Sequence, residues 1–459
     1  MKRLFIVSIL TFFLAGLFLQ PCLAWKGSEG WEERQNAMLE KHGLKVGEVY
    51  DASNGSKIKH LLPESVYNKW LMKGGWKFPI GKFDYYYGVE DRWMKKHAKA
   101  NAGKYTLDSN AVVIEVATGK FPIGRTGITF PMDSFDVKTD PKAGHKILHN
   151  GFSVQSVTSA YFRDFTVDWV GIGGYEKSFF AWINYFNYEG GGAWKPNPNL
   201  FKQNDLLYFT GPHDIEGAVN LSWKYLDGSP TKGFFYVPAI RRVKRLNGAN
   251  RSDPTQGSDF CVDDSNGFAG DPESMEAKYI GQKDFLFPVL EADQHRVLKG
   301  RRAADGTYVM PPGYSAVKAN YLNNNPDPNV DMWALEGIVF VPRTGYQVEL
   351  FPKDPYYNYG KQILWIDQEG LLFVYKEVDD RAGEYWKTAI VMYTALQYGD
   401  DKYVGNGAAA YAMVDDKAHH ASIAPVMGSW KGYDFRSWYN TNRMKPSAFT
   451  PQAISTMSR

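Results

Sequence analysis

The chain has 459 residues, a formal net charge of +3 and a hydrophobic fraction of 44%. A chain of this length can bury a large core in two or three structural units. The nearly balanced charge argues against a nucleic-acid-binding protein, which carries a strongly basic surface. An aromatic content of 15% is high and favours a β-rich protein with broad apolar surfaces.

Residues 1–24 have the three parts of a secretory signal peptide: a basic start, an apolar core and a small-residue cleavage site. The apolar core spans about 16 residues, fewer than the roughly 20 that a membrane-spanning helix needs. Cys22 lies in a poor lipobox, because Gln20 and Pro21 stand where small residues are usual. We therefore expect cleavage after Ala24 and a soluble periplasmic protein, with outer-membrane association as the alternative.

Removal of this segment takes away Lys2 and Arg3 and lowers the net charge from +3 to +1. It also takes away Cys22 and leaves Cys261 as the only thiol. A single thiol cannot form an internal disulfide, so packing must stabilise the mature protein in an oxidising compartment.

The rest of the chain divides into three predicted regions. The pattern of residues 25–150 predicts a helical and extended region, with an amphipathic helix that ends at Gly43. Residues 151–400 are rich in strand patterns, interrupted by a loop-rich stretch over 271–330. We expect residues 401–459 to pack on the sheet that these strands form.

The clearest strand pattern runs over residues 331–388. Short β-prone segments separated by turn residues are typical of an antiparallel meander. Gly345 is predicted as the tight turn between the first two strands. The expected strands cover residues 338–341, 346–351, 361–367, 371–378 and 384–393.

Two polar clusters are candidates for chemistry. Asp415, Asp416, His419 and His420 have spacing that suits metal ligands, but a solvated polar turn is the favoured interpretation. The second cluster could be an acid–base pair or a calcium loop, but a structural role is favoured. In that role the short side chains bond to their own backbone or neutralise the basic run at 241–245. The cluster consists of Asp259, Asp263 and Asp264. We expect no catalytic residue, no metal and no cofactor.

Several segments resemble the DUF1329 family of periplasmic proteins, which are similar to the lipoprotein carriers LolA and LolB. The most specific are residues 223–227 (WKYLD), 234–246 (FFYVPAIRRVKRL), 354–357 (DPYY), 361–367 (KQILWID) and 380–387 (DRAGEYWK). The resemblance implies an α+β fold: a large curved antiparallel sheet, shaped as an incomplete barrel, with helices packed on its concave face.

The resemblance also implies a function, namely binding and carrying a hydrophobic molecule, such as a lipid or a lipoprotein acyl group, through the periplasm. Expected partners are an inner-membrane exporter of the RND type and an outer-membrane protein, with the carrier itself a monomer. One alternative is a periplasmic hydrolase of lipid or glycan, centred on residues 415–420. Another is an envelope- or carbohydrate-binding module that uses exposed Trp169, Trp182 and Trp194.

Two sets of residues are candidates for these roles. Aromatic side chains on the inner face of the sheet are expected to line a hydrophobic cavity: Trp223, Tyr225, Phe340 and Trp365. A basic run on a strand serves either as a charged edge that prevents aggregation or as a docking patch for anionic headgroups or an acidic partner. It consists of Arg241, Arg242, Lys244 and Arg245, with Arg241 and Val243 expected on one side of the strand.

Overall fold

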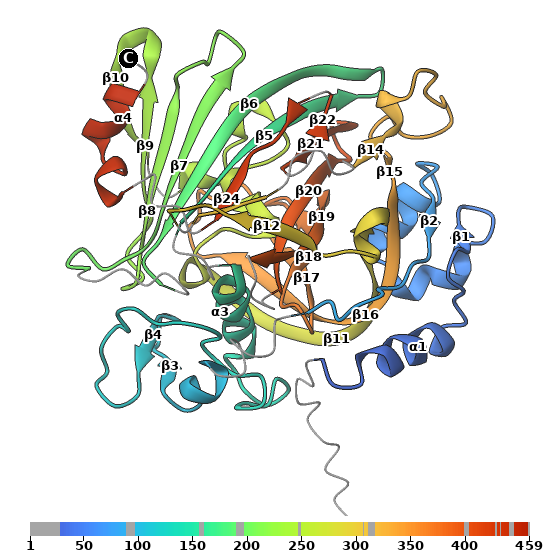
Figure 1. The fold of residues 1–459 in the computed structure, drawn as a ribbon, viewed down its shortest axis with the longest axis horizontal. Helices are drawn as coiled ribbons and strands as arrows, with labels where there is room; N and C mark the ends of the chain where they lie inside the picture. The colour runs from blue at the N-terminus through green and yellow to red at the C-terminus, as the bar shows by residue number, and fades with distance from the viewer. Residues whose placement is uncertain are drawn as a thin grey trace, which may run out of the picture.

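The protein is built around one sheet of 16 strands that curves into an incomplete ring (Figure 1). The computed structural model describes residues 28–88, 97–155, 160–189, 197–246, 249–305, 307–310, 317–398, 404–426, 429–431, 433–439 and 445–457. The predicted signal peptide and Trp194 lie outside these ranges. The curved sheet with helical segments confirms the predicted fold class.

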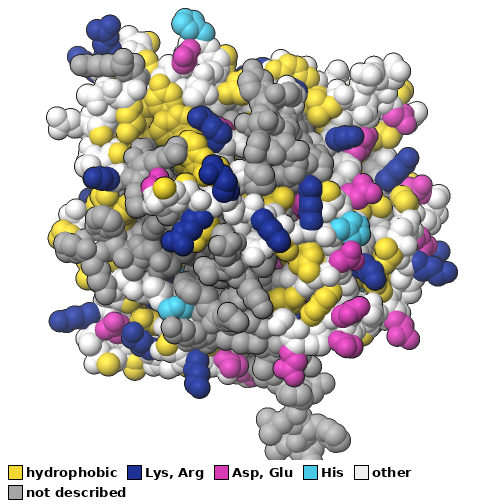
Figure 2. Space-filling view, in the orientation of Figure 1, with side chains coloured by type: hydrophobic (Ala, Val, Ile, Leu, Met, Phe, Trp, Pro, Cys, Tyr) yellow, Lys and Arg dark blue, Asp and Glu magenta, His cyan; other side chains and the backbone are white. Residues whose placement is uncertain are grey.

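One arm of the sheet is a run of antiparallel neighbours that ends in β10. Its strands are β5 (Ala160–Gly171), β6 (Gly174–Asn187), β7 (Phe201–Gly211), β8 (Val219–Tyr225), β9 (Lys232–Val237) and β10 (Arg242–Leu246). Gly174 closes the β5–β6 hairpin at φ 104°, a conformation that favours glycine. Figure 2 shows apolar side chains gathered over this arm and basic side chains across the middle of the same face.

The other arm contains the predicted meander. In pairing order it runs through β19 (Tyr385–Tyr398), β18 (Phe373–Asp379), β17 (Gln362–Asp367), β16 (Ile338–Pro352) and β11 (Met275–Leu290). Two expectations are wrong here. The stretch expected to be loop-rich contains the long strand β11, and β16 continues through Gly345 without a turn. A Cβ on Gly345 would lie 2.7 Å from the Phe285 ring and 2.8 Å from the Ile366 carbonyl oxygen, so close packing explains the glycine.

Strands from the C-terminal region join the two arms. β20 (Val404–Asp415) pairs with β19 and with β21 (His420–Pro425), which pairs with β5. β24 (Ser437–Tyr439) pairs with the other end of β5 and continues through β13 (Tyr308–Val309) to β12 (Leu298–Arg302). β12 runs parallel to β19, so the sheet is mixed, although the other pairs are antiparallel. Residues 404–439 thus supply strands of the sheet itself.

The concave side of the sheet is filled by helix α3 (Ala143–Gln155) and by a segment of short 3₁₀ turns. We call residues 249–274 the plug. It contains η5 (Ala249–Ser252), η6 (Thr255–Gly257), η7 (Val262–Gly267) and η8 (Pro272–Ser274). Phe152 of α3 packs edge-on against Phe268 of the plug and Phe373 of β18. The plug therefore occupies much of the space expected for helices.

Helix α4 (Pro451–Met457) packs on the other face of β8–β10, against Leu221 and Trp223. Ser222 and Lys224 alternate with them and therefore point to the concave side. No helix among the described residues is long and apolar enough to cross a bilayer.

Residues 28–88 pack against the β16 end of the sheet. They form α1 (Trp31–Lys41), β1 (Val49–Tyr50), η1 (Gly55–Leu61), the π-helix η2 (Val66–Leu71) and β2 (Phe78–Pro79). The remaining short elements are β3 (Tyr105–Leu107), β4 (Val113–Glu115), η4 (Pro238–Ile240), η9 (Glu291–Gln294), β14 (Lys318–Ala319), η10 (Asn320–Leu322), β15 (Leu335–Glu336), β22 (Ser429–Trp430), β23 (Tyr433–Asp434) and η11 (Pro446–Ala448).

Candidate functional site

A cavity of about 70 Å³ lies between the plug and the concave face of β5–β8. We call it the apolar cavity, because most of its wall is hydrophobic. The strands contribute Phe165, Val167, Phe179, Ile183, Tyr185 and Leu207; the plug contributes Phe260, Cys261, Val262 and Ala269; β20 contributes Tyr411. Its volume is well below the roughly 300–1,000 Å³ typical of small-molecule sites, so a guest molecule requires movement of the plug.

Three polar residues in the wall of this cavity carry unsatisfied atoms. Asp205 Oδ1, Asn220 Oδ1 and Arg251 Nη1 are buried and have no hydrogen-bond partner among the described residues. A buried polar atom without a partner is costly, and such atoms are rare in native proteins. The wall therefore combines an apolar surface with two acceptors and one donor that a guest can satisfy.

A second cavity, of about 320 Å³, is lined by the β8–β9 turn, the end of the plug and residues 352–357. We call it the vestibule. Its wall includes the polar residues Thr231, Asp263, Asp271, Glu273 and Tyr357. Arg251 also belongs to this wall, so it lines both the vestibule and the apolar cavity.

Arg251 is held in place by Asp263. Its Nε donates to Asp263 Oδ1 at 2.6 Å, and the Tyr357 hydroxyl donates to Asp263 Oδ2 at 2.9 Å. Burial favours the neutral guanidine, but Asp263, Asp271 and Asp205 outweigh it and raise the pKa of Arg251. Arg251 therefore places a permanent positive charge between the two cavities.

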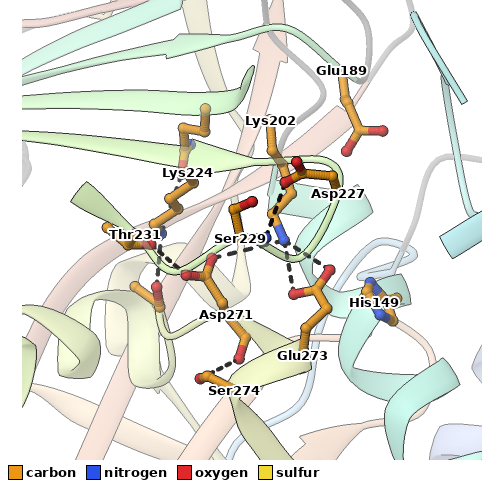
Figure 3. Close-up of polar contacts among 12 residues, drawn as sticks. His149, Glu189, Lys202, Lys224, Asp227, Ser229, Thr231, Asp271, Glu273 and Ser274 are labelled. Carbon is orange, nitrogen blue, oxygen red and sulfur yellow. Dashed lines mark hydrogen bonds and ion pairs between the residues drawn. The ribbon is translucent and has the colours of Figure 1, made fainter. Parts of the chain in front are cut away.

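Beside the vestibule, two lysines meet three acids, and Figure 3 shows four of these residues: Lys202, Lys224, Asp271 and Glu273. Lys202 Nζ lies 3.2 Å from Glu273 Oε2 and 3.8 Å from Asp271 Oδ1. Lys224 Nζ donates to the Ala269 carbonyl oxygen at 2.7 Å and lies 3.7 Å from Asp205 Oδ2.

The charged forms of these groups are unequally favoured. Burial raises the pKa of Asp205 and lowers that of Lys224, so both shift toward neutrality. Burial also raises the pKa of Asp271, but Lys202, Lys224 and Arg251 outweigh it and lower this pKa. For Glu273 burial prevails and the pKa is raised.

The plug is tied to distant strands by side-chain contacts. Asp259 Oδ2 lies 2.7 Å from His420 Nδ1 and accepts a hydrogen bond from Ser422 Oγ at 2.7 Å. Trp169 of β5 donates from Nε1 to the Gly257 carbonyl oxygen at 2.8 Å. These contacts join the plug to β5 and β21.

The predicted acidic cluster has long-range partners instead of the basic run at 241–245. Asp264 pairs with Lys376 and accepts from the Tyr359 hydroxyl at 2.7 Å. It also accepts from the Cys261 backbone N–H at 2.7 Å, which confirms a local backbone contact for this residue. Asp263 pairs with Arg251, as described above.

The contacts of Asp259 with Ser422 and His420 do not form a catalytic triad. In a triad the histidine stands between serine and aspartate and takes the serine proton. Here Asp259 stands between Ser422 and His420, and Ser422 is fully buried. Among the described residues, no group of three His, Cys, Asp or Glu side chains could hold a metal ion.

His420 is not a solvated surface residue, because Asp259 and Glu176 lie beside it, with Glu176 Oε2 at 3.5 Å from Nε2. The hydrogen bond to Asp259 raises the pKa of His420 against the opposing effect of burial. His419 is exposed, as expected.

The four aromatic candidates are dispersed. Phe340 is fully buried and packs on Phe78, and Trp365 is 3% exposed and packs among core rings. Trp223 is half-buried and donates from Nε1 to the Phe449 carbonyl oxygen at 2.8 Å, beside α4. Tyr225 lines the vestibule.

The tryptophans predicted for a binding module are also dispersed. Trp169 is buried, with 4% exposure, and therefore not available on the surface. Trp182 is half-buried and stacks on Tyr208, with 5.0 Å between ring centroids.

The basic run lies at the free edge of the sheet, because β10 ends the strand order. Arg242, Lys244 and Arg245 are exposed on this strand. Arg241 precedes it in a left-handed conformation, with φ 51°, so the predicted sharing of a strand face by Arg241 and Val243 is wrong.

The sequence pattern did not point to Arg251 or to the cavity walls of β7 and β8. The available signal was the polar alternation of Asn220, Ser222 and Lys224. That pattern normally indicates a solvent-facing side, whereas here the polar side faces the plug.

Comparison with known proteins places the chain in a family context. The model of the family described as "Protein of unknown function (DUF1329)" matches residues 49–455. No curated protein matches the chain.

Solved structures with similarity include a putative outer membrane lipoprotein-sorting protein domain from Vibrio parahaemolyticus, with 15% identity and a TM-score of 0.45; the match covers 69% of this chain and 100% of that one. A DUF1329 family protein from Desulfovibrio piger has 14% identity and a TM-score of 0.44, with coverage of 69% and 100%. A LolA superfamily protein from Nitrosomonas europaea has 12% identity and a TM-score of 0.39, with coverage of 67% and 97%.

Proposed function

Because the protein belongs to the DUF1329 family, whose activity is unassigned, we propose from its own cavities that it is a periplasmic carrier of an amphiphilic lipid-like molecule. The observation that carries this proposal is the apolar cavity under the plug, with Arg251 shared between it and the vestibule. The apolar part of the guest occupies the cavity, and its polar head lies at Arg251 in the vestibule.

Movement of the plug provides the volume for the guest. The cavity wall is already apolar on both sides, so displacing the plug exposes the concave face of β5–β8 without rearranging the sheet. The guest then replaces contacts between plug and strands with contacts of its own, which limits the free energy that the exchange costs. The role is binding, with no catalytic step.

The periplasmic location rests on the signal-peptide pattern of residues 1–24. Delivery from an inner-membrane exporter to the outer membrane follows from this carrier role. The exposed cations of β10 are the docking patch, because they lie together at a free sheet edge: Arg242, Lys244 and Arg245.

The test is binding of the fluorescent apolar probe N-phenyl-1-naphthylamine, with palmitate as competitor. Ser222 is buried on the concave side of β8 and lines the apolar cavity, so Ser222→Trp fills the guest's position. We expect this variant to lose probe binding by at least tenfold. Trp223→Ala is the control, because it alters the opposite face of the same strand.

The wild type should bind the probe and release it to palmitate. Failure of the wild type to bind the probe, or unchanged binding by a folded Ser222→Trp variant, would overturn the proposal. Mass spectrometry of organic extracts from the natively purified protein then identifies the guest.

A further inference from the structure

A separate cavity of about 300 Å³ lies between α1, residues 83–87 and the β16 end of the sheet. It shares no lining residue with the apolar cavity or the vestibule. Aromatic rings form much of its wall: Trp31, Phe83, Tyr85, Tyr86 and Tyr87. We call it the aromatic cleft.

Contacts across the cleft fix its shape. Gln35 of α1 donates from Nε2 to the Phe83 carbonyl oxygen at 2.9 Å and accepts from the Phe83 N–H at 2.7 Å. Arg34 of α1 pairs with Glu369 at 3.2 Å. Because these bonds join α1 to the opposite walls, the cleft exists before any ligand binds, which lowers the entropic cost of binding.

A half-buried arginine, Arg343, supports the aromatic wall. The Arg343 guanidinium carbon lies 5.7 Å from the Phe83 ring centroid and 5.6 Å from that of Tyr87. Asp367 accepts from its Nε at 2.6 Å and from Nη2 at 3.0 Å. Asp367 neutralises most of the charge of Arg343, so the wall does not strongly favour an anionic ligand. It offers aromatic rings and hydrogen-bonding groups instead.

The hydroxyl of Tyr87 is buried and has no hydrogen-bond partner among the described residues. Its ring is fixed by stacking on Phe83, with 4.2 Å between centroids and an interplanar angle of 11°. Planar polar side chains complete the wall: Arg34, Gln35, Gln282, Gln368 and Glu369.

We propose that the aromatic cleft is a saccharide-binding site, distinct from the lipid site. Aromatic rings stack on the apolar C–H faces of a sugar, while amide, carboxylate, guanidinium and phenol groups bond to its hydroxyls. An acyl chain satisfies only the first requirement and displaces water from the polar groups without replacing its hydrogen bonds. The volume suits a small saccharide, since it lies at the lower limit of small-molecule sites.

The test is saturation-transfer NMR and calorimetry of the mature protein with glucose, N-acetylglucosamine, maltose and chitobiose. We expect at least one of the four to bind. Trp31→Ala should weaken that binding by about tenfold, the effect of one lost stacking contact. Trp182→Ala is the control, because Trp182 is a half-buried aromatic remote in sequence from the cleft.

Tyr87→Phe is a second control within the aromatic wall. Because its hydroxyl is buried and has no partner among the described residues, its removal should leave saccharide binding unchanged and the midpoint of urea unfolding unchanged or slightly raised. Absence of binding to all four saccharides overturns the proposal, as does wild-type affinity in the Trp31→Ala variant. Naphthylamine binding is measured in parallel, so failure of the lipid site and failure of the cleft are distinguished.

Discussion

The Nε atom of Arg251 lies 2.6 Å from Oδ1 of Asp263, and this buried pair stands where the apolar cavity meets the vestibule. Removing one member of a buried ion pair leaves the other charge without compensation. We therefore expect Arg251→Met to lower the free energy of unfolding by about 3–5 kcal/mol. The double variant Arg251→Met/Asp263→Asn should lose less, and urea unfolding of the full cycle measures the difference. Additive losses would contradict this pairing.

The anchor between His420 and Asp259 predicts a pH dependence of guest entry. The folded protein raises the pKa of His420. The stabilisation that protonated His420 gives to the plug is therefore complete below the ordinary histidine pKa of about 6.5, and it is lost as pH rises through the pKa of the folded state. The plug should therefore open more readily at pH 8.5 than at pH 6. Stopped-flow association of the naphthylamine probe should accelerate over this range in the wild type.

His420→Gln is the matched variant for this pH effect. It keeps a hydrogen-bonding side chain beside Asp259 but cannot titrate, so its association rate should change little between pH 6 and 8.5. An equally steep pH profile in this variant would assign the dependence to another group.

Trp365 should behave as a core residue. It is 3% exposed and packs at right angles to Tyr375, with 6.4 Å between ring centroids. Trp365→Ala should therefore cost about 3–5 kcal/mol of stability, while probe affinity at a temperature where the variant is folded should match the wild type. Tyr356, 82% exposed, supplies the neutral control as Tyr356→Ala. A stable Trp365→Ala variant with altered probe binding would place the guest at Trp365 instead.

The docking role that we propose for β10 predicts a salt-dependent affinity for anionic membranes. Each basic side chain near such a surface contributes about 1 kcal/mol. Replacing Arg242, Lys244 and Arg245 by glutamine should thus weaken binding to phosphatidylglycerol vesicles by roughly 100-fold at low salt. Replacing the exposed cations of β12, namely Lys299, Arg301 and Arg302, removes the same charge elsewhere and should have little effect. Equal losses in both triple variants would indicate a general charge effect.

Local sequence pattern predicted the meander because each strand there is bounded by turn residues and pairs with its sequence neighbour. It missed β11, although Glu276 and Lys278 alternate with buried Met275 and Ala277, because Gly281 and Pro288 later in the same strand are residues typical of loops. It also misinterpreted Gly345, since a glycine required by close packing looks the same in sequence as one required by a turn.

The candidate site was harder to predict for a physical reason. The alternation of apolar and polar residues on β8 distinguishes the two faces of the strand. It does not show which face is turned to the plug, because the apolar face is covered by α4 and the polar face is therefore free to line the cavity. The anchors of the plug join residues far apart in the chain, such as Asp259 and His420, and no local pattern encodes such a contact.

The pairing of β5 with both β21 and β24 constrains when the apolar cavity can form during folding. A chain that emerges N-terminus first presents β5 early, while its two edge partners arrive only with the last part of the chain. Until then one edge of β5 has unpaired backbone N–H and C=O groups, which can pair with a strand of another chain. Tyr411 of the cavity wall arrives equally late. Growing chains must therefore be kept apart from one another until their last strands are available, and a chain cut short near residue 400 lacks both Tyr411 of the cavity wall and the β21 partner of β5.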